Sequence, residues 1–243
     1  MTHKTKGIVL RTVKYGETSL VVTIFTELFG IQTYLVNGVR SSKKNAGRAN
    51  LFQPSALLEL VVYHNDNKSM HRIKEFGWQT VYQQLLQDVI KNSIACFMVE
   101  LLYKCLKQPE SNPDLFHFCE EALLQLDLSP KPVTANFALF FTLHLAHFFG
   151  FRIIDNYDAE NQVLDLSEGC FTGQQPAHPH FLDGAEAATT SLLLKVMQPY
   201  ELDEIKLNHL QRRQLLTRYL DYYALHISEF GQMKTLLVMN EVL

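Results

Sequence analysis

The sequence of 243 residues has few cysteines and no closely spaced cysteine pair. Its four cysteines include no C-x-x-C spacing, which argues against a disulfide framework and against a four-cysteine zinc site. Cys96, Cys105 and Cys119 lie in apolar stretches, where a free cysteine usually packs as a small hydrophobic side chain. We therefore expect these cysteines to be structural.

Long apolar runs and targeting signals are also missing. The most apolar stretch, NFALFFTLHLAHFFGF, is interrupted by Asn136, His144 and His147, so it predicts a buried helix instead of a membrane span. The N-terminal residues MTHKTKGIVLRTVKYG include cations but neither the apolar region nor the small-residue cleavage site of a signal peptide. These features predict a cytoplasmic protein without a membrane partner.

Familiar catalytic motifs are absent as well. The sequence contains no G-x-S-x-G turn, no G-x-x-x-x-G-K-[ST] phosphate loop and no H-E-x-x-H zinc helix. The acids Asp155, Asp158, Glu160 and Asp165 lack the ordered spacing of a calcium loop and are typical of a solvated loop. These absences argue against an enzyme without excluding one, and no residue is predicted to be catalytic. A metal-dependent nuclease that uses these acids is the weakest of the alternatives.

Two histidine groups are the remaining candidates for a metal site. His144 and His147 are spaced i, i+3 on one predicted helix, but their neighbours are apolar, which favours partly buried, hydrogen-bonded histidines. Cys170, His178 and His180 supply three donors without the fourth ligand and paired spacing of a structural zinc site. We therefore predict no metal and no cofactor.

Acidic residues are missing from a long segment near the N-terminus, between positions 28 and 58. Residues 1–80 contain 11 Lys and Arg against 5 Asp and Glu, whereas residues 81–243 contain 11 against 20. This asymmetry indicates a basic part that meets a polyanion and an acidic part with another role, although an ordinary fluctuation is the alternative. The stretch NGVRSSKKNAGRANLFQP concentrates the cations Arg40, Lys43, Lys44 and Arg48.

Short β-type runs fill the chain up to about residue 80. They alternate or are rich in β-branched residues, and turn residues separate them. Five short strands predict a small barrel of the OB or SH3-like type, and OB barrels bind oligonucleotides with strand faces and loops. The expected strands are residues 6–15, 19–26, 31–39, 55–64 and 68–78.

After residue 80 the apolar period changes from about 2 to about 3.6 residues. This predicts an α-helical domain over residues 80–243, interrupted at 151–184 by a polar insertion with short strands or irregular loops. The first helix should carry an apolar stripe of Leu86, Ile90, Ile94, Phe97, Leu101 and Cys105. The expected helices are residues 84–106, 112–126, 134–150 and 209–227.

The first 80 residues resemble the N-terminal barrel of the bacterial RecO family of recombination mediators. The resemblance rests on the strand GIVLRT, the turn YGETS, Thr26 and Gly30 around the second turn, NGVR followed by Ser and Lys, and LFQPSALLELVVYH. The ending FGQMKTLLVMNEVL is similar to the family's closing helix and tail. The resemblance implies an α+β chain: an OB-type barrel over residues 1–79 and then a helical domain, with no enzymatic turnover.

One departure from that family concerns the insertion at 151–184. Many members carry a four-cysteine zinc-ribbon-like insertion there, and this chain keeps only Cys170. The insertion is therefore a degenerate one, and any role of zinc in the family does not carry over to this chain.

The resemblance also implies a function and partners. RecO proteins bind single- and double-stranded DNA, anneal complementary strands held by single-strand-binding protein and, with RecR, help load RecA at gaps. It thus implies partners in DNA, RecR and single-strand-binding protein, an indirect link to RecA, and a nucleoid location. Arg212, Arg213 and Arg218 are predicted to bind the acidic tail of single-strand-binding protein, unless they form an ordinary solvated face. A protein-interaction scaffold with incidental DNA contact is the alternative function.

The predicted DNA-binding site consists of the basic loop and cations on the barrel. Clustered Lys and Arg attract a phosphate backbone whatever its sequence. Tyr34, Tyr63 and Phe76 could stack bases, but Tyr and Phe in strands more often pack in a core, so we leave them out of the site. The predicted residues are Arg40, Lys43, Lys44, Arg48, Lys14, Arg72 and Lys74.

Overall fold

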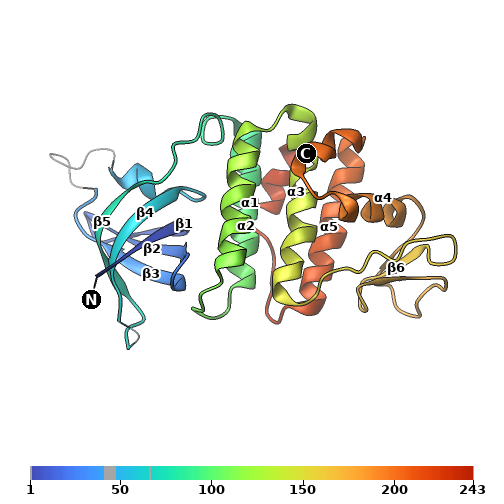
Figure 1. Cartoon of the computed structure of the whole chain (residues 1–243), viewed down its shortest axis with the longest axis horizontal. Helices are drawn as coiled ribbons and strands as arrows, with labels where there is room; N and C mark the ends of the chain where they lie inside the picture. Colours follow the sequence, from blue (N-terminus) through green and yellow to red (C-terminus); the bar gives the residue numbers. More distant parts are fainter. Residues whose placement is uncertain (1, 41–47, 66, 243) are drawn as a thin grey trace. The chain divides into compact units, whose positions relative to one another are not determined.

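Two compact units make up the chain in the computed structural model, which describes residues 2–40, 48–65 and 67–242 (Figure 1). The barrel unit consists of Met1–Gln87 and Leu106–Asp127, and the helical unit of Asp88–Cys105 and Leu128–Leu243. The chain thus enters the helical unit, returns to the barrel unit and leaves it again. The predicted domain limits of 1–79 and 80–243, a single cut in the sequence, stay a prediction.

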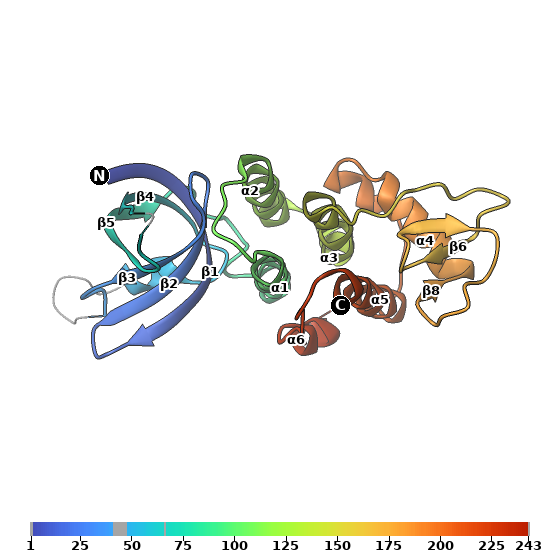
Figure 2. The ribbon, with the colours of Figure 1, turned by 90° about the horizontal axis from the view of Figure 1, so that it is seen from below.

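Five strands close a barrel in the order β1-β2-β3-β5-β4 (Figure 2). Strands β3 and β5 run parallel and pair through Tyr34↔His71 and Leu35↔Arg72, while the other neighbours are antiparallel. This arrangement, followed by helices, confirms the predicted α+β fold with an N-terminal OB-type barrel. The strands are β1 (Thr2–Tyr15), β2 (Ser19–Thr26), β3 (Gly30–Val36), β4 (Leu57–Tyr63) and β5 (His71–Trp78).

Strand β1 is long because it serves two neighbours. Its first half pairs with β4 and its second half with β2, and both pairings include Gly7 and Ile8. A Cβ atom on Gly7 would lie 2.5 Å from Cγ2 of Ile24, so only glycine fits where the two ladders overlap. A register shift between Val9 and Arg11 marks a bulge there. Such a bulge increases the local twist and bends the strand around the barrel.

The turn between β2 and β3 gives a physical reason for the Thr26 and Gly30 motif. The hydroxyl of Thr26 accepts a hydrogen bond from the backbone N–H of Phe29 at 3.1 Å and donates to the carbonyl of Gly30 at 2.9 Å. Gly30 has a φ of +63°, and a Cβ atom there would lie 2.1 Å from the carbonyl oxygen of Glu110. The motif therefore fixes both the turn and the close approach of the segment before helix α2.

Replacing Gly30 with alanine is expected to lower the free energy of unfolding by at least about 1 to 2 kcal/mol. Left-handed backbone is unfavourable for alanine, and the new methyl group forces Glu110 to move. Gly16 is a matched control, because its φ is +58° but nothing lies within 4 Å of an added Cβ. Urea unfolding of both variants measures the effect. Equal losses for Gly16→Ala and Gly30→Ala would contradict the close approach.

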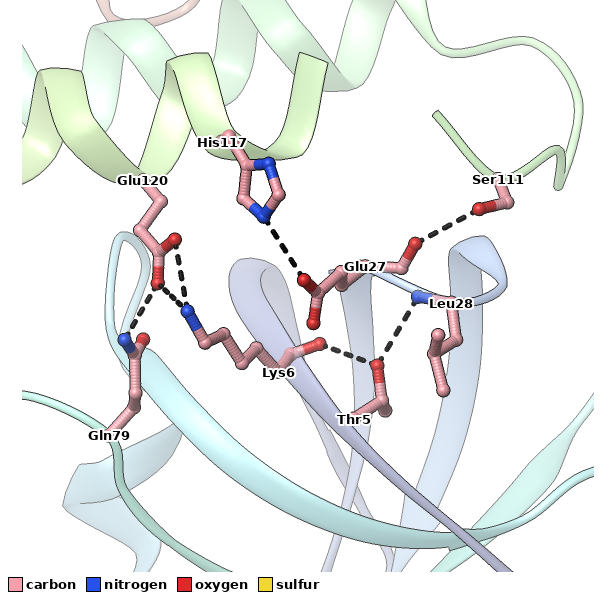
Figure 3. A network of polar contacts seen from close by, with 8 residues as sticks. All are labelled: Thr5, Lys6, Glu27, Leu28, Gln79, Ser111, His117 and Glu120. Atoms are coloured by element: carbon pink, nitrogen blue, oxygen red, sulfur yellow. Dashed lines mark hydrogen bonds and ion pairs between the residues drawn. The ribbon is translucent and has the colours of Figure 1, made fainter. Parts of the chain in front are cut away.

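Helix α2 (Pro113–Leu128) packs on the barrel within the barrel unit (Figure 3). Glu120, whose side chain is 11% exposed, accepts hydrogen bonds from Lys6 Nζ at 2.9 Å and from Gln79 Nε2 at 2.7 Å. His117 Nε2 lies 3.1 Å from a carboxylate oxygen of Glu27. These contacts tie two turns of the helix to β1, to the end of β5 and to the β2–β3 turn. The sequence pattern did not anticipate this attachment.

The end of α2 also organises the chain that leaves the barrel. The carboxylate of Asp127 accepts hydrogen bonds from three consecutive backbone N–H groups, those of Gln83, Gln84 and Leu85, at 2.8, 2.8 and 2.6 Å. Nearby, the hydroxyl of buried Tyr82 donates to the carbonyl of Ser55 at 2.8 Å. Burial, with the charges of Asp127 and Glu120, raises the pKa of Tyr82 above its usual value. The phenol therefore stays protonated as a donor.

The first helix begins five residues later than predicted, so the predicted start at residue 84 is wrong. Helix α1 spans Val89–Cys105, and Asp88 caps it by accepting from the N–H groups of Ile90 and Lys91. Asp127 holds residues 83–85 in a turn, which removes them from the helix. Ile90 is exposed instead of forming part of the apolar stripe.

Helices α1, α3 and α5 lie side by side in the helical unit, with α3 in the middle (Figures 1 and 2). Helix α3 with the following 3-10 turn, Lys131–Phe149, is long and apolar enough to cross a membrane, yet 67% of it is buried in the structure. The prediction of a buried helix is therefore confirmed. Helix α4 was not predicted. The remaining helices are α3 (Lys131–Leu145), α4 (Gly184–Lys195), α5 (His209–His226) and α6 (Leu236–Val242), with 3-10 turns at Arg48–Phe52, Ala146–Phe149 and Pro199–Glu204.

The C-terminal motif is held against α1 inside the helical unit. The carboxylate of Glu100 accepts hydrogen bonds from the backbone N–H groups of Lys234 and Thr235 at 2.8 Å each, directly before α6. Lys104 Nζ donates to the carbonyl of Phe230 at 2.6 Å. The stretch FGQMKTLLVMNEVL is thus an integral part of this unit.

The insertion forms a small sheet, as predicted. It contains β6 (Val163–Asp165), β7 (Cys170–Thr172) and β8 (Phe181–Leu182) in the order β7-β6-β8. Arg218 on α5 donates to the carbonyl of Phe181 at 2.6 Å, and Tyr222 on α5 donates to the carbonyl of Phe151. Helix α5 therefore fixes both ends of the insertion.

Candidate nucleic-acid interface

Two of the predicted cations lie beside the hairpin that joins β1 and β2. Arg40 is exposed, its backbone N–H donates to the carbonyl of Thr18 at 3.0 Å, and its guanidinium lies 3.4 Å from the carbonyl oxygen of Gly16. Lys14, also exposed, is the second-last residue of β1 and pairs with Leu20. The hairpin therefore brings Lys14 and Arg40, which are far apart in sequence, to the same end of the barrel.

Arg48 stands at the other end of the basic stretch, where the 3-10 turn Arg48–Phe52 begins. Its guanidinium carbon lies 4.4 Å from the centre of the Phe76 ring, a cation–π contact on β5. Phe52 packs against the same ring, with 4.7 Å between centroids. Arg48 thus keeps an exposed charge on a fixed aromatic support. The predicted residues Lys43 and Lys44 lie outside the described residues.

The cations of β5 are exposed, but their surroundings differ. Arg72 lies opposite Leu35 of β3 and Tyr63 of β4. Val61 pairs with Glu75 and Val62 with Ile73, so Lys74 is the extra residue of a β-bulge in β5. Lys74 and its neighbour Glu75 are consequently both exposed, and they form an ion pair at 3.3 Å. A neighbouring carboxylate reduces the attraction of Lys74 for phosphate, so Arg72 is the stronger candidate.

The three aromatic residues considered for base stacking have different positions. Tyr34 is fully buried in the barrel core, where burial raises the pKa of its phenol above the usual value. Phe76 is covered by Phe52 and Arg48. Tyr63 is 47% exposed at the end of β4. Of the three, only Tyr63 presents a large exposed ring to solvent, and the sequence alone could not separate it from the others.

Lys14, Arg40 and Arg72 lie at one end of the barrel sheet. Lys14 on β1 pairs with Leu20 on β2, which pairs with Val36 on β3. The residue before Val36 is Leu35, and it pairs with Arg72 on β5. Neighbouring strands are about 4.8 Å apart, so Lys14 and Arg72 are roughly 14 Å apart along the sheet. Successive residues alternate between faces, so Lys14 shares a face with Leu20 and Val36, whereas Arg72 shares the opposite face with Leu35. The structure therefore places Lys14 and Arg40 beside one hairpin and Arg72 at the same end of the barrel on the other face of the sheet, and their role in DNA binding stays a prediction.

The three arginines predicted for a protein partner do not form one exposed group. The guanidinium of Arg212 donates to the carbonyl of Leu207, and burial lowers its pKa. Arg218 is held by the carbonyl of Phe181 and lies 3.5 Å from a carboxylate oxygen of Asp221. Arg213 and Arg218 line a groove of about 560 Å³ between α4, α5 and α6, together with the exposed Leu210. Of the three arginines, Arg213 is therefore the best placed to bind a protein partner.

The acids and histidines of the insertion are engaged in local contacts. Asp155 accepts from Ser191 at 2.8 Å and lies 3.5 Å from Lys195. Asp165 lies 3.4 Å from His178. Asp158 accepts from the N–H groups of residues 160 and 161, and these hydrogen bonds lower its pKa. Across residues 2–40, 48–65 and 67–242, no group of three or more His, Cys, Asp and Glu side chains is arranged to hold a metal ion.

His144, Cys96, Cys105 and Cys119 are packing residues of the helices, whereas Cys170 lies on β7. Burial lowers the pKa of His144, a shift that the backbone of Val196 and Leu193 opposes. The imidazole is therefore mostly neutral near neutral pH. Its ring centre lies 4.3 Å from that of Phe140. All the cysteines are free, with Cys105 and Cys119 buried, and burial raises the pKa of Cys96.

The fold defines a class of proteins in which an OB-type barrel with exposed cations is joined to a helical unit. Two family models cover most of the sequence: "Recombination protein O N terminal" matches residues 1–81, and "Recombination protein O C terminal" matches residues 86–235. The chain belongs to the RecO family, whose curated members are DNA repair proteins. The resemblance seen in the sequence is thereby confirmed.

Several full-length relatives share the description "DNA repair protein RecO". That of Bacteroides fragilis (strain ATCC 25285) is 34% identical over 244 residues, and that of Phocaeicola vulgatus is 33% identical over 242 residues. A relative from Azobacteroides pseudotrichonymphae is 30% identical over 242 residues. Each alignment covers 100% of this chain and 99% of the relative. Both units of this chain are therefore shared with DNA repair proteins.

Proposed function

We propose that this protein is a recombination mediator that binds single- and double-stranded DNA through its barrel and anneals complementary strands. The observation that supports this most is that the exposed cations Lys14, Arg40 and Arg72 all lie at one end of an OB-type barrel in a member of a DNA repair family. Such a surface attracts phosphates of any sequence, which a mediator needs because gaps occur at any sequence. In this role the protein works in the cytoplasm at the nucleoid.

The proposal extends to protein partners. With RecR, the protein helps to load RecA on DNA covered by single-strand-binding protein. The acidic tail of single-strand-binding protein would bind the groove beside Arg213 and Arg218, where Leu210 offers an apolar contact next to the cations. The acidic balance of residues 81–243 supports a division in which this part of the chain meets proteins more than DNA.

In the proposed function the protein binds DNA and protein partners and catalyses no reaction. The acids of the insertion are spread over separate contacts with Ser191, Lys195, His178 and backbone N–H groups. This dispersal disfavours the nuclease alternative, which needs carboxylates that converge on a metal ion.

Annealing of labelled complementary oligonucleotides, with and without single-strand-binding protein, tests the proposal. We expect duplex formation to be faster with the protein and to persist when the strands are coated. A parallel incubation of labelled DNA with Mg²⁺ should show no cleavage. If the protein did not accelerate annealing and its effect did not depend on salt, the interaction scaffold would be favoured. Cleavage of the labelled DNA would favour the nuclease.

A further inference from the structure

A pocket of about 580 Å³ lies at the end of the barrel where β3, β4 and β5 meet. Tyr63 and His64 at the end of β4, His71 and Arg72 at the start of β5, and Lys68 and Met70 of the connecting loop contribute to its lining. This volume lies within the range of about 300 to 1,000 Å³ typical of small-molecule sites. The sequence analysis placed the site on the cations of the basic stretch and of the barrel, including Arg72, but did not anticipate a pocket here.

Aromatic rings form a continuous stack beside the pocket. The rings of Phe29 and His64 are nearly parallel, with 3.9 Å between centroids and 12° between planes. His64 in turn stacks on His71 at 4.7 Å and 20°. His64 thus lies between Phe29 and His71, and His71 is buried, so the stack holds these side chains in place and borders the pocket without offering a free ring face. Tyr63, 47% exposed, adds an accessible ring on the same lining.

Cations stand at the same pocket. Lys68 and Arg72 are both exposed lining residues, and Arg72 pairs in register with Tyr63 across β4 and β5. Met70, 43% exposed, adds a polarizable apolar surface. The loop sequence also includes one carboxylate, Asp66, which lies outside the described residues. An aromatic surface beside a cation matches the two parts of a nucleotide, a flat base and a phosphate.

We propose that this pocket takes one unpaired nucleobase of a single strand, with the base stacked on Tyr63 and a neighbouring phosphate on Lys68 and Arg72. The inference rests on the proposed DNA binding and deepens it. A base in a duplex already has stacked neighbours on both faces, whereas an unpaired base can stack on Tyr or His side chains. The pocket therefore makes the barrel prefer single strands, which a uniform basic surface does not do.

Tyr63→Ala in the full chain tests the pocket by fluorescence anisotropy of labelled oligonucleotides. We expect single-strand affinity to fall at least about 5-fold, the lower end of the range for losing one base stack, with duplex affinity unchanged. The salt dependence should stay the same because no charge is removed. Tyr63→Phe should retain the affinity, and Tyr200→Ala, at an exposed tyrosine of the helical unit, is the matched control.

A second variant and a second readout separate stacking from charge. Lys68→Ala with Arg72→Ala should flatten the single-strand salt slope by about 1.4, two phosphate contacts at roughly 0.7 each. A 2-aminopurine base in the oligonucleotide should be quenched by the wild-type protein and less so by Tyr63→Ala. Unchanged affinity and quenching in a folded Tyr63→Ala protein would overturn the pocket while leaving DNA binding intact. Failure of the wild-type protein to bind any DNA would overturn the proposed function itself.

Discussion

Replacing Arg40, Lys43, Lys44 and Arg48 together with alanine is expected to flatten the dependence of log affinity on log salt for single strands by about 3. Each phosphate contact contributes roughly 0.7 to that slope through counterion release, and four contacts are removed. The loss of affinity should be similar for unrelated sequences, because phosphate contacts carry no direct base information. Fluorescence anisotropy of labelled oligonucleotides at several salt concentrations measures both quantities.

The quadruple variant needs two controls: its own stability, and a variant that removes the same charge elsewhere. Surface substitutions usually stay within about 0.5 kcal/mol each, but Arg48 also loses its contact with the Phe76 ring, which adds about 0.5 to 1 kcal/mol. A variant lacking four exposed lysines elsewhere removes the same total charge and should keep the slope. An unchanged slope in the folded quadruple variant would leave Lys14, Arg72 and the pocket as the binding surface. The control lysines are Lys107, Lys131, Lys206 and Lys234.

Replacing Asp127 with alanine is expected to lower the free energy of unfolding by about 2 to 4 kcal/mol. Three backbone N–H groups lose a charged acceptor at once, and the buried Leu85 has the least access to water as a substitute. For a chain of this size the thermal midpoint should fall by roughly 5 to 15 °C. Thermal unfolding followed by circular dichroism measures the shift.

Conservative and surface variants separate this anchor from a general loss of charge. Asp127→Asn keeps one acceptor oxygen, so its loss should be smaller than that of the alanine variant. Asp203→Ala removes an exposed carboxylate that lies 3.3 Å from Lys206 Nζ, and it should change stability by no more than about 0.5 kcal/mol. If all three variants unfolded at the wild-type temperature, the hydrogen bonds of Asp127 would contribute nothing net to the barrel unit.

Local periodicity predicted the barrel well because the sequence pattern of a strand lies within the strand itself. The runs SLVVTIFT and SALLELVVYH alternate or are rich in β-branched residues, and the observed strands β2 and β4 lie within them. Helix α5 was likewise visible, because its apolar face is a local feature. Such patterns need only a few neighbouring residues.

Long-range partners could not be predicted in the same way. The pattern of α2 is that of any amphipathic helix, and nothing local shows that Glu120 meets Lys6, 114 residues earlier in the chain. The start of α1 was misplaced for a similar reason, since Asp127 holds residues 83–85 from a distant position. At the candidate site, cations could be named from composition, whereas the separation of Tyr63 from Tyr34 and Phe76 depends on burial, which only the folded barrel determines.

The double crossing of the chain between the two units has a consequence for synthesis on the ribosome. The strands of the barrel leave the ribosome first, but Glu120 and Asp127 follow only after α1, which belongs to the other unit. Until α3 and α5 have been made, the apolar side of α1 has no partner within its own unit, and such exposed surface is prone to aggregation. Completion of the barrel unit and exposure of an unfinished helical unit therefore overlap in time, so neither unit can mature independently during translation.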